Sequence, residues 1–136
     1  TQGVDDTQNT NITTTDTKAQ AAFDTANAAM IIPQNRQSVD YTLQNSDSGK
    51  HLYYSGLKTS VNLYIPWTSN TTYANGTTIT IISNTSSNVN IIPNNSVSLY
   101  LAGNTTSISR NVTTYGMATM IMTAANTWYI NGTGVI

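Results

Sequence analysis

The sequence predicts a mainly β protein, with an antiparallel β-sandwich or jelly-roll-like head domain that follows a short N-terminal helix. Two observations predict this fold class. After Pro33, apolar and polar residues alternate in short runs that small polar turns separate. Before Pro33, alanine dominates and apolar residues recur at helical spacing. The chain therefore divides into residues 1–14, 15–32 and 33–136.

Residues 1–14, TQGVDDTQNTNITT, are polar and show no apolar periodicity. Such a segment is typical of a flexible arm, or of one that becomes ordered on a partner. We expect it to serve as an attachment arm.

Residues 15–32 are expected to form a helical stem, because Asp16 can cap its start and Pro33 follows its end. A short heptad pattern, with steps of 4, 3, 4, 3 and 4 residues, gives these oligomerisation candidates: Ile12, Asp16, Ala19, Phe23, Ala26 and Met30. Isolated helices of this length are marginally stable in water. The stem is therefore expected to pack either on identical helices, as in a trimeric coiled coil, or on the β domain of its own chain.

Strands are expected near residues 40–44, 50–55, 61–66, 77–82, 89–92, 97–101, 108–113, 118–123 and 127–130. Glycine and asparagine turns separate them, and TITIISN followed by VNIIPNN looks like a hairpin. Tyr53 and Tyr54 are adjacent in a strand, so one of them should face the core and the other the surface. Trp128 alternates with Ile130 and should lie in the core.

Charge is scarce, at 8% of the residues, and after Thr59 the only charged residue is Arg110. A chain with so little electrostatic repulsion suits an assembly better than a free monomer. The net charge of −1, without a Lys/Arg cluster, argues against nucleic acid as a partner. No apolar run is long enough for membrane insertion, and there is no cysteine.

The residues offer little for catalysis. His51 is the only histidine, and Asp40 and Asp47 are the carboxylates nearest to it in sequence. Paired carboxylates for glycoside hydrolysis and the ligand spacing of a calcium loop are both missing. We therefore expect no catalytic residues, no metal site and no cofactor, and a protein that is not an enzyme.

One loop, IPWTSNTTYANG, combines aromatic rings with amide and hydroxyl groups. Trp67, Tyr73 and Asn75 are therefore candidate receptor contacts, since a saccharide surface needs both an apolar face and directional hydrogen bonds. The alternative is that the same loop is buried between neighbouring subunits.

Several motifs follow one another between Pro33 and the C-terminus: YTL at 41–43, DSGK at 47–50, IP at 65–66, GTTITIISN at 76–84, GMAT at 116–119 and WYINGTG at 128–134. Their order and spacing resemble the β domain found at the ends of many tailed-bacteriophage fibre and virion proteins. The segment AQAAFDTANAA is similar to the sequences that precede such domains. Related sequences often carry a charge where this chain has Met120-Ile121-Met122, which indicates a buried or subunit-facing strand.

The resemblance implies a non-enzymatic virion structural protein, either a short fibre or a capsid-decoration protein, located at the virion surface. It implies a component that is often a homotrimer, with a helical stem and a β-structured head. We expect the N-terminal arm to contact other virion proteins, and the head to contribute to adhesion to a host-surface glycan. A carbohydrate-binding module or cell-surface adhesin is the alternative. A polysaccharide depolymerase is disfavoured by the shortage of acidic residues.

Overall fold

The structure, a computed structural model, describes residues 2–29, 31–68, 72–84 and 86–136. The chain forms two compact units, Thr1–Ile32 and Pro33–Ile136. The division falls at the position where the apolar period of the sequence changes from helical to alternating.

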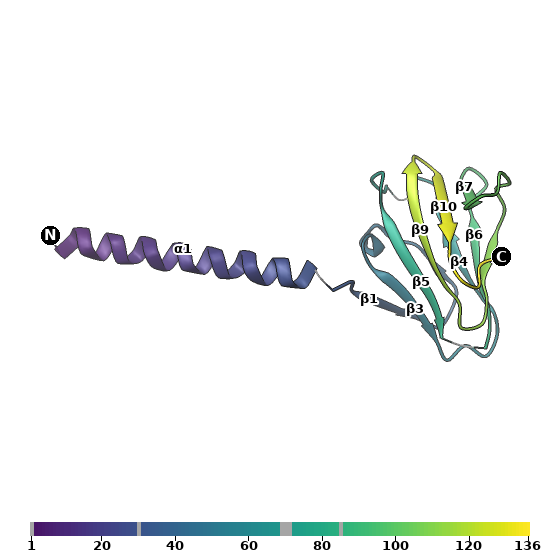
Figure 1. Ribbon diagram of the computed structural model, residues 1–136, viewed down its shortest axis with the longest axis horizontal. Coiled ribbons are helices and arrows are strands. Elements are labelled where there is room, and N and C mark those ends of the chain that lie inside the picture. Colours follow the sequence, from purple (N-terminus) through teal and green to yellow (C-terminus); the bar gives the residue numbers. More distant parts are fainter. Residues whose placement is uncertain (1, 30, 69–71, 85) are drawn as a thin grey trace. The chain divides into compact units, whose positions relative to one another are not determined.

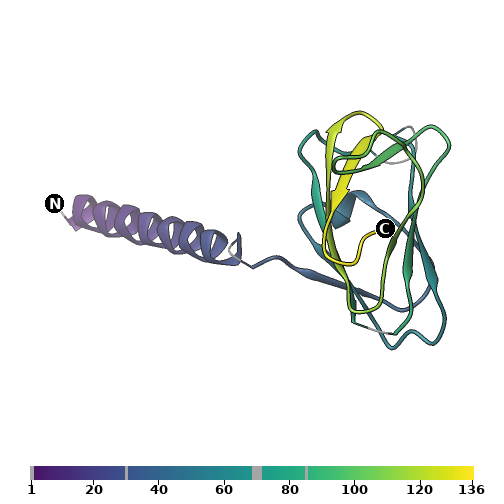
Figure 2. The same cartoon turned by 45° about the vertical axis from the view of Figure 1, so that its right-hand side comes forward.

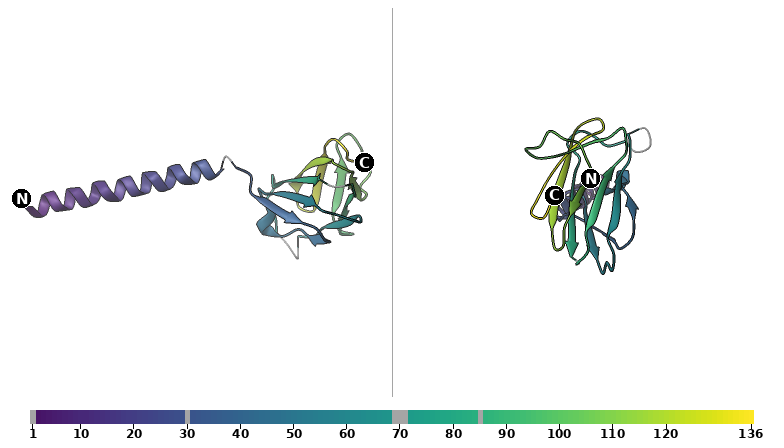
Figure 3. Two further views of the ribbon diagram at one scale, coloured as in Figure 1. Left: turned by 90° about the horizontal axis from the view of Figure 1, so that it is seen from below. Right: turned by 90° about the vertical axis from the view of Figure 1, so that its right-hand side faces the viewer.

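The first unit contains one helix, α1 (Gln2–Ala29), which is continuous over 28 residues (Figures 1 and 3). The expected flexible arm is therefore wrong in its secondary structure, because residues 2–14 are helical. Threonine hydroxyls along the helix donate to the carbonyl four residues earlier, at 2.9–3.0 Å: Thr7, Thr10, Thr13, Thr14, Thr15, Thr17 and Thr25. These bonds satisfy the threonine hydroxyl groups without interrupting the helix. Threonine hydroxyls that bond other backbone groups nearby favour turns instead.

The second unit is built from two mixed sheets and a short 3₁₀ helix, η1 (Asn45–Asp47). The six-stranded sheet has the order β1 (Gln34–Gln37), β3 (His51–Ser55), β5 (Thr78–Asn84), β9 (Met117–Ala124), β10 (Thr127–Asn131) and β7 (Ser98–Leu101). The four-stranded sheet has the order β2 (Tyr41–Thr42), β4 (Val61–Ile65), β6 (Val89–Pro93) and β8 (Arg110–Val112). Figure 2 shows the two sheets as separate layers.

From β1 to β6, consecutive strands alternate between the two sheets. β1, β3 and β5 pair in parallel in one sheet, and β2, β4 and β6 pair in parallel in the other. This part of the chain therefore winds as a flattened coil. β8 and β9 then run antiparallel to β6 and β5, and β10 closes a hairpin with β9.

The expectation of a mainly β unit after an N-terminal helix is confirmed. The expected antiparallel direction is wrong for part of each sheet, because both sheets are mixed, and the expected hairpin between TITIISN and VNIIPNN is wrong. β5 and β6 belong to different sheets and pair with other strands. The physical reason is that the alternation of apolar and polar residues indicates which side chains face the core, but it does not indicate which strands are neighbours in a sheet. A short polar turn can equally well join two strands that face each other across the core.

Both sheets contribute to one hydrophobic core. Its largest fully buried side chains include Trp128, Tyr54, Leu63 and Ile91. The predictions for the aromatic residues are confirmed: Trp128 is in the core, and Tyr54 is buried while Tyr53 lies on the opposite face of β3.

Candidate interaction surfaces

The helix exposes its apolar residues. Residues 3–27 of α1 are all exposed, and Phe23 keeps 62% of its surface in solvent. Ile12, Asp16, Ala19, Phe23 and Ala26 lie within α1 at heptad spacing and thus along one side of the helix, which we name the seam. Met30, the last predicted member, lies outside the described residues. The described members of the seam are all exposed.

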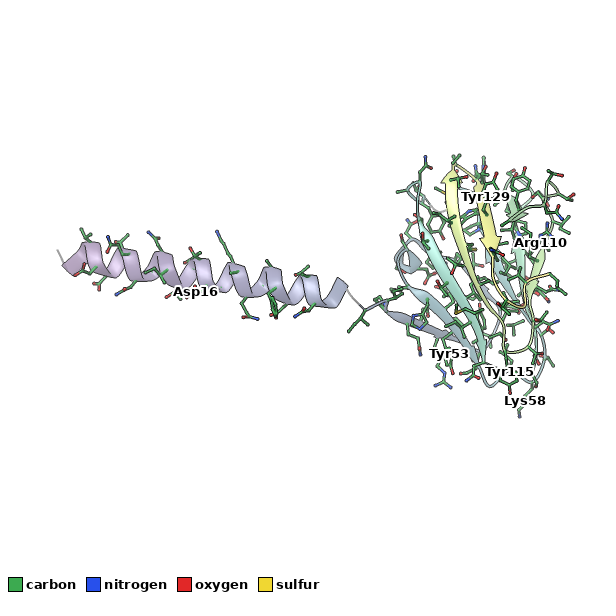
Figure 4. All side chains as sticks on the ribbon, in the orientation of Figure 1. Asp16, Tyr53, Lys58, Arg110, Tyr115 and Tyr129 are labelled. Atoms are coloured by element: carbon green, nitrogen blue, oxygen red, sulfur yellow. The ribbon has the colours of Figure 1, made fainter. Side chains whose placement is uncertain are left out.

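A shallow concavity follows the helix surface between Asp16, Thr17, Gln20, Ala21 and Asp24. The Gln20 amide donates a 2.9 Å hydrogen bond to Oδ1 of Asp24 along the same face. All its lining residues belong to α1, so no second element encloses it. Figure 4 shows Asp16 projecting from this helix. We assign no small-molecule site to it.

The β unit has two ends, defined here by strand direction. Pro33 lies at the proximal end, where its carbonyl accepts a 2.9 Å hydrogen bond from the His51 N–H at the start of β3. The Gly76 N–H bonds the Met122 carbonyl at 2.7 Å, which places the Asn75-Gly76 turn at this same end. The loop after β4 joins them, because the Thr68 N–H donates to the Asn126 side chain at 2.8 Å.

The three predicted receptor contacts thus belong to the proximal end, and they do not form one surface. Trp67 and Asn75 are exposed. Tyr73 is only 7% exposed, and its ring packs edge-on against Trp128 with centroids 5.4 Å apart. Burial raises the pKa of the Tyr73 hydroxyl well above its usual range. Tyr73 therefore cannot contact a receptor without leaving the core.

The distal end carries a surface aromatic residue that the sequence reasoning missed. The distal end consists of the turns after β3, β5 and β8, which carry Lys58, Ser86 and Tyr115, respectively. The Thr114 hydroxyl links the turns after β8 and β5 by donating a 3.2 Å hydrogen bond to the Ser86 carbonyl. Figure 4 shows Tyr115 and Lys58 at this end. The positive φ of 55° and the 71% exposure of Tyr115 distinguish it.

Left-handed backbone at a bulky residue costs about 1–2 kcal/mol. Glycine would remove this cost at Tyr115, and the exposed ring contributes little to the core. Tyr115 therefore gains neither a relaxed backbone nor burial at this turn, and it is an exposed aromatic candidate for contact with another molecule. A left-handed φ leaves no signal in the sequence when the residue is not glycine or asparagine, which is why Tyr115 was missed.

His51 and the two aspartates considered with it occupy structural positions. The His51 ring nitrogen Nε2 lies 3.1 Å from the side-chain oxygen of Gln34 on the neighbouring strand. Asp40 accepts a 2.9 Å hydrogen bond from the Asn62 N–H. Asp47 is fully buried and accepts hydrogen bonds from Asn35 and other donors near the first strands.

Within the described ranges, no group of three or more His, Asp or Glu side chains is arranged to hold a metal ion. The helix that the structure describes is also not apolar enough to cross a membrane.

The outer faces of the two sheets differ in chemistry. On the four-stranded sheet, Asn62, Asn90 and Asn111 form one row across β4, β6 and β8, and the Asn90 amide donates to the Asn62 side chain at 3.2 Å. On the six-stranded sheet, β5, β7, β9 and β10 contain no charged residue. The outward residues of that sheet include the following set, which we name the apolar face: Tyr53, Ile82, Tyr100, Met117, Ile121 and Tyr129.

No protein-family model matches the chain, and no curated protein matches its sequence.

Proposed function

We propose that the chain is a non-enzymatic structural protein of a bacteriophage virion, either a short fibre or a capsid-decoration protein. In this proposal α1 is the stem of a homotrimeric coiled coil, and residues 33–136 are a head displayed at the virion surface. One observation carries the proposal: a 28-residue helix exposes Ile12 and Phe23 along a single seam, and a separate β unit follows it.

The physical argument concerns the stability of α1. Threonine and asparagine are intrinsically poor helix formers, and residues 7–17 contain many of them. In proteins most helical stability comes from burial of an apolar face. Packing three copies of α1 would bury Ile12, Ala19 and Phe23. Asp16, a polar residue within the seam, would lower the stability of the coil and fix its register.

The proposal gives each end of the chain a task. The polar N-terminal part of α1 contacts other virion proteins, in the role that the sequence assigned to an attachment arm. The head contributes to host-surface adhesion by contacting a glycan. Tyr115 is the contact that the backbone geometry favours, and Trp67 and Asn75 are exposed candidates at the other end.

A carbohydrate-binding module or cell-surface adhesin is the second candidate function. The exposed Trp67 and Tyr115 favour it, because aromatic rings on loops are suitable for stacking on sugar rings. Such modules commonly act as monomers, so the oligomeric state separates the two functions.

The test is the solution mass of the full chain by size-exclusion chromatography with light scattering. We expect a trimer, and we expect Phe23→Asp to dissociate it because a carboxylate in the seam would be buried without a partner. Ala21→Asp is the matched control, since Ala21 is exposed in the same helix but outside the seam. A monomeric wild-type chain, or equal effects of the two variants, would remove the stem from the assembly mechanism.

A further inference from the structure

The apolar face gathers six apolar or aromatic side chains on the outer side of the six-stranded sheet. Two cross-strand rows form it, Tyr53–Ile82–Met117 and Ile121–Tyr129–Tyr100. The Tyr100 and Tyr129 rings lie 5.4 Å apart, and Met117, Ile121 and Tyr129 remain exposed. Exposed apolar side chains gathered on one face of a sheet are typical of an interaction site.

Composition narrows the choice of partner. The centres of protein interfaces are depleted in charge and enriched in tyrosine and methionine, as this face is. A polar row runs between the two apolar rows, where the Thr80 and Thr119 hydroxyl oxygens lie 3.1 Å apart and bond to each other. β5, β7, β9 and β10 carry no charge, whereas the exposed Arg36 of the edge strand β1 pairs with Tyr53 at the border of the face. Over β5, β7, β9 and β10, identical copies of the face can approach one another without electrostatic repulsion.

The short connection between α1 and β1 indicates that the partner at this face is a second copy of the chain. Only residues 30–33 connect α1 to β1, and four residues bridge at most roughly 18 Å between Ala29 and Gln34. Helices of a coiled coil lie about 8–10 Å apart. A domain of about 100 residues has a radius of gyration near 13 Å. Heads that follow bundled stems are therefore held in contact range at high effective concentration.

We propose that the apolar face is the contact surface between heads of neighbouring copies, and that the face turns toward the symmetry axis of the assembly. This inference rests on the proposed stem, because the stem brings the heads together. The asparagine row on the other sheet then faces water. The resulting particle presents amide groups and the distal turns outward, and it hides Ile121 and Tyr129.

The test is cysteine accessibility in the full chain, which contains no cysteine of its own. Ile121→Cys probes the apolar face, and Tyr64→Cys probes the outer face of the four-stranded sheet. The two parent side chains are matched in exposure, at 40% and 37%. Each variant is checked for assembly by light scattering and then labelled with a maleimide under native and denaturing conditions. Thr119→Cys, also exposed and on the same face, replaces Ile121→Cys if that variant fails to assemble.

In the native assembly, we expect the Ile121→Cys variant to react with the maleimide at least about tenfold more slowly than the Tyr64→Cys variant. After denaturation the two variants should react equally fast. Equal native rates in an intact trimer would overturn the inference and leave the proposed function standing. Protection that appears only after a neutral oligosaccharide is added would also overturn it, because the face would then be a ligand surface. A monomeric wild-type chain would instead overturn the proposed stem, and the inference with it.

Discussion

The Tyr41 hydroxyl donates a 2.8 Å hydrogen bond to Oδ2 of Asp47, a carboxylate with no exposed surface. The Gln44 N–H donates to the same oxygen at 2.8 Å, and the Asn35 amide donates to Oδ1 at 2.7 Å. These donors come from β1, β2 and the start of η1. One buried carboxylate thus joins the first strands of both sheets, which gives Asp47 a structural role.

Replacing Asp47 with alanine should destabilise the β unit by about 3 kcal/mol, because three part-buried hydrogen bonds to its buried carboxylate are lost. Urea unfolding of the full chain, followed by the near-ultraviolet signal of its aromatic residues, measures the change. Asp40→Ala is the control: Asp40 is exposed and accepts one backbone hydrogen bond, so its loss should cost about 1 kcal/mol or less. Equal costs for the two variants would contradict the role assigned to Asp47.

Alkaline pH should destabilise the β unit. Burial raises the pKa of Tyr54 and Tyr73, and burial followed by the bond to Asp47 raises the pKa of Tyr41. In the unfolded chain these groups ionise near pH 10. The folded state then binds more protons than the unfolded chain. The contribution of these tyrosines to stability is therefore constant below pH 10 and falls above it, by about 1.4 kcal/mol per pH unit for each tyrosine that stays protonated. Unfolding midpoints that stay unchanged from pH 8 to above pH 11 would rule this out.

Tyr54→Phe should stabilise the protein by about 1 kcal/mol, because the Tyr54 hydroxyl is buried and has no hydrogen-bond partner in the part of the chain that the structure describes. Tyr53 is the matched control, since its hydroxyl bonds the Asn84 amide at the surface. Tyr53→Phe should be neutral or cost about 0.5–1 kcal/mol. Thermal unfolding of the two variants compares them, and a Tyr54→Phe variant less stable than Tyr53→Phe would indicate an unseen partner of the hydroxyl.

Gly132→Ala should cost about 3 kcal/mol or prevent folding, since an added Cβ would collide with the backbone of Met117 and Ala118. Gly103→Ala is informative beside it: Gly103 has open space around it but a φ of 84°. Its substitution should cost only about 1 kcal/mol, from the left-handed backbone. The expression level and melting temperature of the two variants decide whether close packing, rather than backbone conformation, dominates at Gly132.

Much of the strand content could be predicted from sequence, since each expected strand has a counterpart among β2 to β10. β1 was missed because Gln34–Gln37 is polar and carries no alternation; its parallel pairing with β3 holds it in the sheet. The helical extent of residues 2–14 was missed for a related reason, because threonine and asparagine favour other conformations locally.

The interaction surfaces were harder to predict. Alternation correctly separates Met120 and Met122, which are buried, from Ile121, which is exposed. Alternation cannot predict the burial of Tyr73, because this residue lies outside the strands and packs into the core against Trp128. The apolar face was also out of reach, since it depends on β7 lying beside β10, a pairing between strands far apart in the chain.

The pairing of parallel strands also affects the rates of folding and unfolding. Gln34 pairs with His51, His51 with Thr80, and Thr80 with Thr119, so these strand pairs join distant parts of the chain. Among the strand pairs in the described residues, only β9 and β10 follow each other directly in the sequence. Long loops must close before any of these pairings contributes, which slows folding. The barrier is crossed in both directions, so unfolding is expected to be slow as well. A head of this kind would be kinetically stable: it would remain folded under denaturing conditions because it unfolds slowly, even with an ordinary free energy of unfolding.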